Sequence, residues 1–199
     1  MTRLILASTS SARKLILEKA GLSFDAIPPR IDEDALKQAL LSEAVSPRDM
    51  ADALAEAKAV KLSLKFPEAL VIGADQMLAF DDGTMLDKPD SPETAKAQLA
   101  LMSGSHHRLF SAAVIAKGGA PLWRHVGIVR MSVRPLSSAF IDDYVDRNWD
   151  AIRYCVGCYQ IENEGAQLFS RIEGDHFDIM GLPLLPLLAF LRERKEIAS

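Results

Sequence analysis

A short apolar run near the amino terminus passes through small hydroxyl residues to an arginine. The sequence of residues 4–13 is LILASTSSAR. A helix that begins after such a run presents unpaired backbone N–H groups and the positive end of its dipole, and both attract an anion. The hydroxyls of Ser8, Thr9 and Ser10 and the guanidinium of Arg13 therefore predict a phosphate-binding loop. A serine that caps the helix, followed by a solvated arginine, is the simpler alternative.

An aspartate at the end of a long apolar run is the second candidate. Residues 69–80 read ALVIGADQMLAF, so Asp75 lies in an otherwise apolar context. A carboxylate in such surroundings is costly unless it binds a metal, pairs with a cation or takes up a proton. The pattern predicts a functional acid at Asp75. An aspartate that bonds to the backbone of its own turn is the alternative.

Three further charged segments carry weaker patterns. Lys88 precedes Pro89, which holds it in an extended conformation, although a solvated loop lysine explains the same pair. The acids at residues 32–34 (Asp-Glu-Asp) offer hard oxygen donors that suit Mg²⁺, although acidic clusters are commonly solvated or cap helices. Periodicity alone does not distinguish Lys58 from an ordinary surface lysine of an amphipathic helix.

The composition is that of a globular protein rather than a nucleic-acid-binding or membrane protein. The chain has 199 residues, of which 49% are hydrophobic and 25% charged, and its formal net charge is −4. A polyanionic ligand must then be bound by a few local basic groups or through a metal ion. The best apolar stretch, Leu182–Leu191, is short and contains two prolines, and no signal-peptide core precedes residue 13. We expect a cytoplasmic protein that binds neither nucleic acid nor membrane.

The two cysteines form a single Cys-x-x-Cys motif at Cys155 and Cys158. A structural zinc site needs two more ligands, and the four histidines show no paired ligand spacing. The motif also does not follow a strand at the start of a helix, as it does in thioredoxin-like proteins. The sequence favours reduced, buried thiols over zinc or redox chemistry.

The elements that must position these residues alternate between strands and helices. Helix caps are readable at Ser46-Pro47 and Ser91-Pro92, and Lys117–Ala120 joins two strands as a hairpin. This order predicts an α/β fold with a mixed sheet, in one domain over residues 1–199. Strand patterns cover about residues 3–7, 23–28, 69–74, 76–80, 109–116, 122–134 and 167–172, and helical patterns cover about residues 11–20, 47–65, 92–103, 137–147 and 184–195.

Taken together, these segments resemble the Maf family, the septum-formation-associated nucleoside triphosphate pyrophosphatases. A further pair, Lys58-Ala59, matches the family's Lys-Ala on the second helix, but Ala57 replaces the glutamate that usually precedes it. The resemblance extends from residue 4 to about residue 190. Five blocks match in order: Leu6–Ser10 with Arg13; Asp32-Glu33; Gly73–Asp75; Lys88-Pro89 with the helix ending Met102–Gly104; and Arg171–Asp175 through Gly181–Leu184.

The resemblance implies a fold and a reaction. The fold is an elongated mixed β-sheet flanked by helices, with two lobes and a central cleft, as in inosine triphosphatases, and the protein is a homodimer. The reaction is hydrolysis of the α–β phosphoanhydride of a nucleoside triphosphate to the monophosphate and pyrophosphate. A divalent cation, Mg²⁺ or Mn²⁺, is held by Glu33 and Asp75. Asp75 is the general base, and the triphosphate is bound by Ser8, Arg13, Lys58 and Lys88.

Three positions bear on which base is bound. Ala12, Gln76 and Glu162 are similar to the branch of the family associated with 7-methyl-GTP, because the dTTP- and UTP-preferring branch has Arg, Thr and Gln there. A guanine edge offers two adjacent N–H donors that a carboxylate can accept together. We expect Gln76 and Glu162 to contact the base, and the face of Tyr159 to favour a positively charged, N7-methylated ring.

Two other functions stay open from the sequence. The first is a pyrophosphatase for dTTP or UTP in the same family, in which Glu162 makes only a structural hydrogen bond. The second is a nucleotide-binding regulator of cell division and septum formation that hydrolyses its ligand slowly or not at all. Acidic residues that face a polyanion argue against a pure binder unless a metal joins the two.

Overall fold

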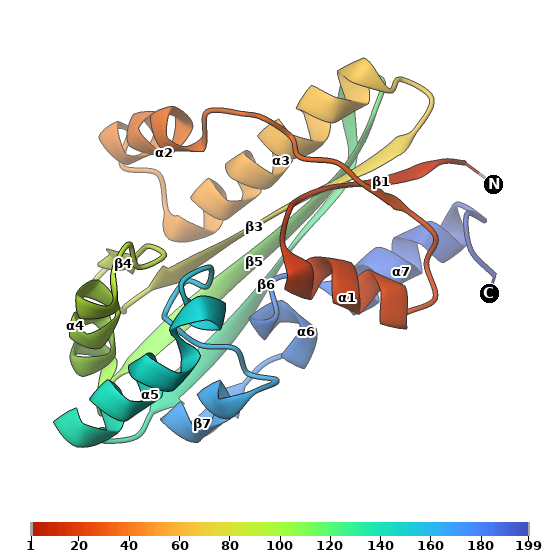
Figure 1. Ribbon diagram of the computed structural model, residues 1–199. Helices are drawn as coiled ribbons and strands as arrows, with labels where there is room; N and C mark the ends of the chain where they lie inside the picture. Colours follow the sequence, from red (N-terminus) through yellow and green to blue (C-terminus); the bar gives the residue numbers. More distant parts are fainter. Residues whose placement is uncertain (1, 199) are drawn as a thin grey trace. The chain divides into compact units, whose positions relative to one another are not determined.

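The computed structural model describes residues 2–198 as an α/β protein (Figure 1). Within this range seven strands form one mixed sheet in the order β2-β1-β3-β5-β6-β7, with β4 paired to β3. The strands are β1 (Leu4–Ala7), β2 (Asp25–Ala26), β3 (Leu70–Ala79), β4 (Met85–Leu86), β5 (His106–Lys117), β6 (Ala120–Val133) and β7 (Phe169–Glu173). The helices are α1 (Ser11–Lys19), α2 (Glu33–Ser42), α3 (Pro47–Lys65), α4 (Pro92–Met102), α5 (Ser138–Ile152), the 3₁₀ helix η1 (Glu164–Leu168), α6 (His176–Ile179) and α7 (Leu184–Glu193).

Internal contacts divide the chain into two compact units. The first unit comprises the chain up to Gln76, Phe110–Gly127 and the chain from Asp175 onward. The second unit comprises Met77–Leu109 and Ile128–Gly174. Strands β3, β5 and β6 contribute residues to both units. The expectation of a single domain over residues 1–199 stays a prediction.

In the first unit, the parallel strands β1 and β3 are covered on both faces, whereas both residues of β2 are exposed. Side chains alternate along a strand, so successive residues of β3 point to opposite faces. Leu70, Ile72 and Ala74 join one apolar cluster with α1 and α7, whereas Val71 packs with Leu62 of α3 in another. Because both faces are buried, β3 is a nearly continuous apolar run rather than an alternating one.

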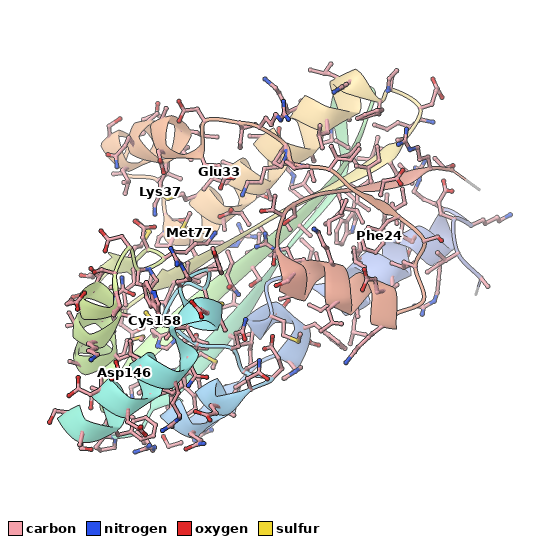
Figure 2. The ribbon with its side chains drawn as sticks, in the orientation of Figure 1. Phe24, Glu33, Lys37, Met77, Asp146 and Cys158 are labelled. Atoms are coloured by element: carbon pink, nitrogen blue, oxygen red, sulfur yellow. The ribbon has the colours of Figure 1, made fainter. Side chains whose placement is uncertain are left out.

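The second unit is built on the remaining halves of the long strands. β7 pairs antiparallel with β6, and α4 packs against α5. Lys96 of α4 pairs with Asp142 and Asp146 of α5; Asp146 is labelled in Figure 2. Cys155 and Cys158 are free thiols; Cys158 is buried as expected, whereas Cys155 is only partly buried.

Most of the expected elements are present. Helix α3 has the bounds expected for it, because Ser46 caps its start by accepting from the Asp49 N–H at 3.1 Å. The mixed sheet and the flanking helices confirm the expected α/β class. Parallel pairs join β1 to β2 and β3, and antiparallel pairs join β3 to β4 and β6 to β7.

Several elements differ from the sequence-based expectation, among them β4 and η1, which no expected range covers. β3 is one strand from Leu70 to Ala79, not two runs interrupted at Asp75, because that carboxylate is paired and does not break the strand. Helices α2 and α6 are additional to the expected elements; α2 buries none of its residues and α6 has only four, so neither has the apolar periodicity of a longer helix. Among residues 2–198, no helix has both the length and the apolar character needed to cross a bilayer.

Candidate active site

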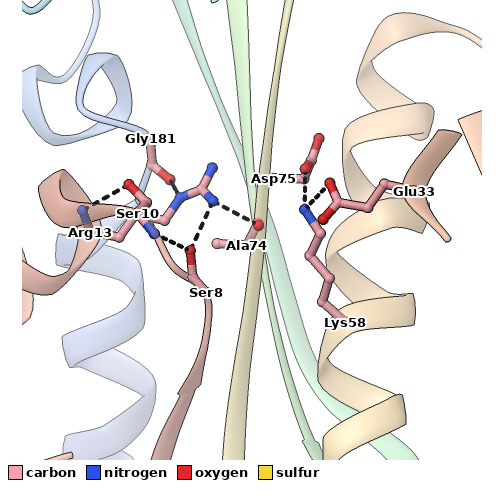
Figure 3. Close-up of polar contacts among 8 residues, drawn as sticks. All are labelled: Ser8, Ser10, Arg13, Glu33, Lys58, Ala74, Asp75 and Gly181. Carbon is pink, nitrogen blue, oxygen red and sulfur yellow. Dashed lines mark hydrogen bonds and ion pairs between the residues drawn. The ribbon is translucent and has the colours of Figure 1, made fainter. Parts of the chain in front are cut away.

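The candidate site lies in the first unit, where β1 ends and its neighbour β3 continues. Ala7, the last residue of β1, is paired with Gly73, and β3 runs six residues further. The chain then turns through Ser8–Ser10 into α1, with Ser10 as the N-cap. The carboxyl end of a parallel strand and the N-terminus of a helix therefore meet beside the part of β3 that continues past β1 (Figure 3).

Arg13 of α1 is fixed by three acceptors in this position. Its Nε donates to the Gly181 carbonyl at 2.7 Å, and its Nη1 donates to the Ala74 carbonyl at 3.0 Å and the Ser8 hydroxyl at 3.4 Å. These bonds use Nε and Nη1, and among the described residues no acceptor bonds to Nη2. Burial lowers the pKa of Arg13, and the charges of Asp75 and Glu33 oppose that shift.

Gly73 brings α3 close to β3. A Cβ atom at Gly73 would lie 2.1 Å from the Ala55 carbonyl oxygen and 2.6 Å from the Ala59 nitrogen. Only glycine permits this approach, because both contacts are to backbone. Lys58 lies between the two alanines on α3, and Asp75 lies two residues beyond Gly73 on the same face of β3. The close packing thus sets Lys58 opposite Asp75.

Lys58, Asp75 and Glu33 form a three-membered ion pair (Figure 3). The Lys58 Nζ lies 2.6 Å from Asp75 Oδ1 and 2.8 Å from Glu33 Oε2. The Lys58 and Asp75 side chains are only 7% and 12% exposed, whereas that of Glu33, in the first turn of α2, is 50% exposed. The buried pair is therefore rigid, and Glu33 approaches it from the solvent side.

The two carboxylates fit a divalent cation that is only partly bound by protein. Glu33 and Asp75 both point at one position, which the Lys58 ammonium holds. Residues 2–198 contain no cluster of three or more His, Cys, Asp or Glu that could hold a metal. Mg²⁺ commonly takes one or two carboxylates and completes its shell with phosphate and water. Asp32 does not join this set, since its Oδ1 caps α2 by accepting from the Ala35 N–H at 3.0 Å.

The structure brings together five of the expected site residues. Arg13 contacts Ser8 directly and lies within the electrostatic range of Asp75 and Glu33, which both contact Lys58. Unrelated sequence patterns singled out four of these residues: a hydroxyl-rich loop with Ser8 and Arg13, an acidic cluster with Glu33, and a strand aspartate at Asp75. Lys58 carried no signal of its own, and the resemblance alone identified it.

Gln76 points away from this cluster. It follows Asp75 on β3 and so faces the opposite side of the sheet, where its Nε2 donates to Ser111 Oγ at 2.8 Å and to the Asp178 carbonyl at 2.9 Å. The expected contact of Gln76 with a base stays a prediction.

Lys88 and Glu162 belong to the second unit and share a neighbourhood there. Burial raises the pKa of the Cys155 thiol, the charge of Glu162 raises it further, and Lys88 opposes the shift. Both charges therefore lie near the same thiol. Lys88 and Glu162 are both exposed. Their expected roles, with the triphosphate and the base respectively, stay predictions.

Sequence reasoning missed the backbone groups that orient Arg13. The carbonyls of Ala74 and Gly181 carry no signature in residue types. One signal was available at Gly181: it has a φ of +92°, which a Gly-Leu-Pro sequence permits, and a Cβ there would lie 3.3 Å from Arg13 Nε.

The fold is shared with a protein of distant sequence. A solved structure described as "Structure of a HAM1 protein from Coxiella burnetii" matches with a TM-score of 0.51 and 14% identity, covering 97% of this chain and 100% of that chain. Identity at this level shows a common α/β fold and nothing about function.

Residues 3–194 match the family described as "Maf-like protein". The chain belongs to this family. A relative from Ruegeria pomeroyi is 56% identical over 96% of each chain, and one from Sphingopyxis alaskensis is 55% identical over 95% of this chain and 96% of its own. A relative from Caulobacter vibrioides is 53% identical over 96% of each chain. All three are called nucleoside triphosphate pyrophosphatase. The resemblance inferred from five short blocks is thereby confirmed.

Proposed function

We propose that this protein is a nucleoside triphosphate pyrophosphatase that hydrolyses the α–β phosphoanhydride to a nucleoside monophosphate and pyrophosphate. The observation that carries the proposal is the buried pair of Lys58 and Asp75, with Glu33 on its solvent side and Arg13 nearby. A binding protein gains little from two carboxylates that face a polyanion. An enzyme needs both a base for water and cations for the leaving group. The names of the relatives support the same reaction.

Each residue then has a part in the reaction. Asp75 accepts a proton from the attacking water, and the adjacent Lys58 ammonium offsets charge that develops on the phosphoryl oxygens. Arg13 and the Ser8 hydroxyl hold phosphate at the N-terminus of α1. A divalent cation, when bound by Glu33 and Asp75, would neutralise phosphate charge and act as a Lewis acid. Lys88 completes the binding of the triphosphate.

We further propose that the preferred substrate is 7-methyl-GTP or another guanine-like triphosphate. A carboxylate at Glu162 accepts two adjacent N–H donors and is favoured further by a cationic base. An amide at this position would suit uracil or thymine better, because it can both donate and accept. Homodimerisation, which the resemblance implies, and a cytoplasmic location, which the sequence pattern favours, both stay predictions.

The test is pyrophosphate release from 7-methyl-GTP, GTP, dTTP, UTP, CTP and ITP at fixed Mg²⁺ or Mn²⁺, with and without a chelator. We expect the 7-methyl-GTP signal to dominate, to disappear with chelator and to fall by about 10²–10⁴-fold in Asp75→Asn. Asp142→Asn, an exposed carboxylate of α5, is the matched control and should retain activity.

Other outcomes separate the alternatives. A preference for dTTP or UTP would keep the reaction and overturn the base assignment. If the protein binds nucleotides but releases pyrophosphate from none of the six, the proposed enzymatic activity is wrong and a nucleotide-binding regulator is favoured. Full activity in chelator would contradict the metal assignment to Glu33 and Asp75.

A further inference from the structure

The amide of Gln76 is occupied inside the protein. Its Nε2 donates to Ser111 Oγ at 2.8 Å and to the carbonyls of Asp178 and Ile179 at 2.9 and 3.1 Å. An amide nitrogen has two hydrogens, so these three acceptors use its donor capacity. No donor of Gln76 is left for a nucleobase.

The segment that Gln76 holds is fixed by two more strands. Ser111 of β5, which is fully buried, donates to the same Asp178 carbonyl at 2.5 Å. The Asp178 side chain lies over Gly127 of β6, where a Cβ would meet Asp178 Oδ2 at 2.1 Å. Three neighbouring strands thus fix residue 178 at the end of α6.

The same segment orients Arg13 three residues later. The Gly181 N–H donates to the Asp178 carbonyl at 3.1 Å, which closes a turn. The Gly181 carbonyl then accepts from Arg13 Nε at 2.7 Å. A continuous chain of hydrogen bonds therefore runs from Gln76 through the Asp178–Gly181 turn to the guanidinium.

We propose that Gln76 is a positioning residue that sets the orientation of Arg13 through the Asp178–Gly181 turn, and that it does not read the base. The proposal deepens the proposed function, since it rests on Arg13 binding the phosphates of the substrate. Phosphates are common to every nucleoside triphosphate. The contribution of Gln76 is accordingly the same for all bases, whereas that of a base-reading residue differs between them.

The first test is Gln76→Met, which keeps the length of the side chain and removes its donors. We expect kcat/KM to fall roughly tenfold for every nucleotide of the panel, by the same factor within about threefold. Gln167→Met, the same change at an exposed position of η1, is the matched control and should have no effect. A change of more than about tenfold in the ratio between two bases, or no fall for any base, would overturn the proposal.

The second test asks whether the effect passes through Arg13. In an Arg13→Ala background, Gln76→Met should lower kcat/KM by less than about twofold, because residues that act as a unit are not additive. An equal fall in both backgrounds would overturn the route through Arg13. Ser111→Ala removes the hydrogen bond from the buried Ser111 hydroxyl to the Asp178 carbonyl and should show the same base-independent loss. This variant replaces Gln76→Met in the test if thermal melting shows that Gln76→Met is unfolded.

Failure of the positioning role of Gln76 can be told apart from failure of the proposed pyrophosphatase activity. If the unaltered protein releases no pyrophosphate from any nucleotide, the proposed function fails. The positioning role is then measured as affinity for inorganic pyrophosphate by calorimetry. We expect that affinity to drop roughly tenfold in Gln76→Met. An affinity equal to that of the unaltered protein would overturn the inference.

Discussion

At the scale of single residues, the site depends on one buried cation that two carboxylates share. Lys58 and Asp75 are both nearly inaccessible to water, and Glu33 is half exposed. Removing one partner of a buried ion pair leaves the other charge desolvated and unpaired, whereas a half-exposed partner is replaced by water. The three residues should therefore contribute unequally to stability even though each contacts the same ammonium.

Lys58→Met tests this inequality. We expect it to lower the free energy of unfolding by about 3 kcal/mol, because Asp75 loses its counter-charge. Glu33→Gln should cost less than about 1 kcal/mol. Urea unfolding at neutral pH measures both. Equal losses in the two variants would contradict the difference in burial, and a double variant Lys58→Met with Asp75→Leu should recover most of the loss.

Glu162 is the residue on which the base assignment depends. Glu162→Gln replaces an acceptor-only side chain with one that also donates. We expect the ratio of kcat/KM for 7-methyl-GTP over UTP to fall by about 10–100-fold, which corresponds to the loss of one charge-assisted hydrogen bond. Steady-state kinetics with the two nucleotides measures it. A parallel fall for both substrates would show that Glu162 does not discriminate between them.

At the scale of elements, the close packing of α3 on β3 positions the buried pair. The approach is possible because Gly73 faces Ala55 and Ala59, and no longer side chain fits there. Small residues on both elements thus permit the close approach that sets Lys58 opposite Asp75. We expect larger residues at these positions to reduce activity because they would increase the distance between Lys58 and Asp75.

Gly73→Ala should separate α3 from β3. Its Cβ would overlap the Ala55 carbonyl, which is backbone and cannot rotate away, so we expect a loss of about 3 kcal/mol or more in stability and loss of activity. Gly83→Ala is the matched control: its φ is +88° and nothing lies within 4 Å of the added Cβ. That change should cost about 1 kcal/mol and retain activity. Equal melting temperatures for the two variants would contradict this account.

At the scale of the whole molecule, two buried titratable groups give the stability opposite pH dependences. Burial, with a smaller contribution from Asp175, raises the pKa of Asp178 from 3.8 to about 6. Burial also lowers the pKa of His107, in the second unit, from 6.5 to about 4. Asp178 Oδ1 and His107 Nδ1 are both buried without a hydrogen-bond partner among the described residues, so neither charge is compensated locally.

Asp178→Asn should stabilise the protein at neutral pH and not at pH 4. The folded protein holds the Asp178 proton more tightly than the unfolded chain, so protonation of Asp178 stabilises the unaltered protein. That contribution is complete below pH 3.8 and is lost as the pH rises through about 6. At about 1.4 kcal/mol for each pH unit, the charged carboxylate costs up to about 3 kcal/mol. The difference in unfolding free energy between variant and unaltered protein, measured from pH 4.5 to 7.5, should grow with pH.

His107→Gln should have the opposite pH dependence. Below pH 6.5 the His107 side chain is protonated in the unfolded chain, whereas in the folded protein it stays neutral until about pH 4. The unaltered protein therefore loses stability as the pH falls over that interval. Glutamine can still bond to the Tyr159 hydroxyl, which lies 2.9 Å from His107 Nε2. Relative to the unaltered protein, the variant should gain stability as the pH falls from 6.5 to 4.5. A difference that does not change with pH would show that His107 titrates normally.

The sequence by itself determined most elements and the family. Helix starts with a serine cap and a following proline, as at Ser46-Pro47, are local, so their bounds can be read without knowing the fold. Apolar runs likewise located the main strands. The sequence also singled out Ser8, Arg13 and Asp75 as candidates, because hydroxyls near a helix start and a carboxylate among apolar residues stand out locally. Glu33 stood out as a member of an acidic cluster, and the roles of all four residues stay predictions.

Only the tertiary structure decided which of these side chains face one another. Lys58 looks like any helical lysine until Gly73 brings α3 against β3, and Asp75 looks like a strand break until that lysine neutralises it. Gln76 is adjacent to Asp75 in sequence but faces the other side of the sheet. Arg13 is oriented by the Gly181 carbonyl, 168 residues away. Backbone acceptors are the same for every residue type, so such contacts depend on the folded path of the chain. The sequence marks them only where the conformation favours glycine, as at Gly181.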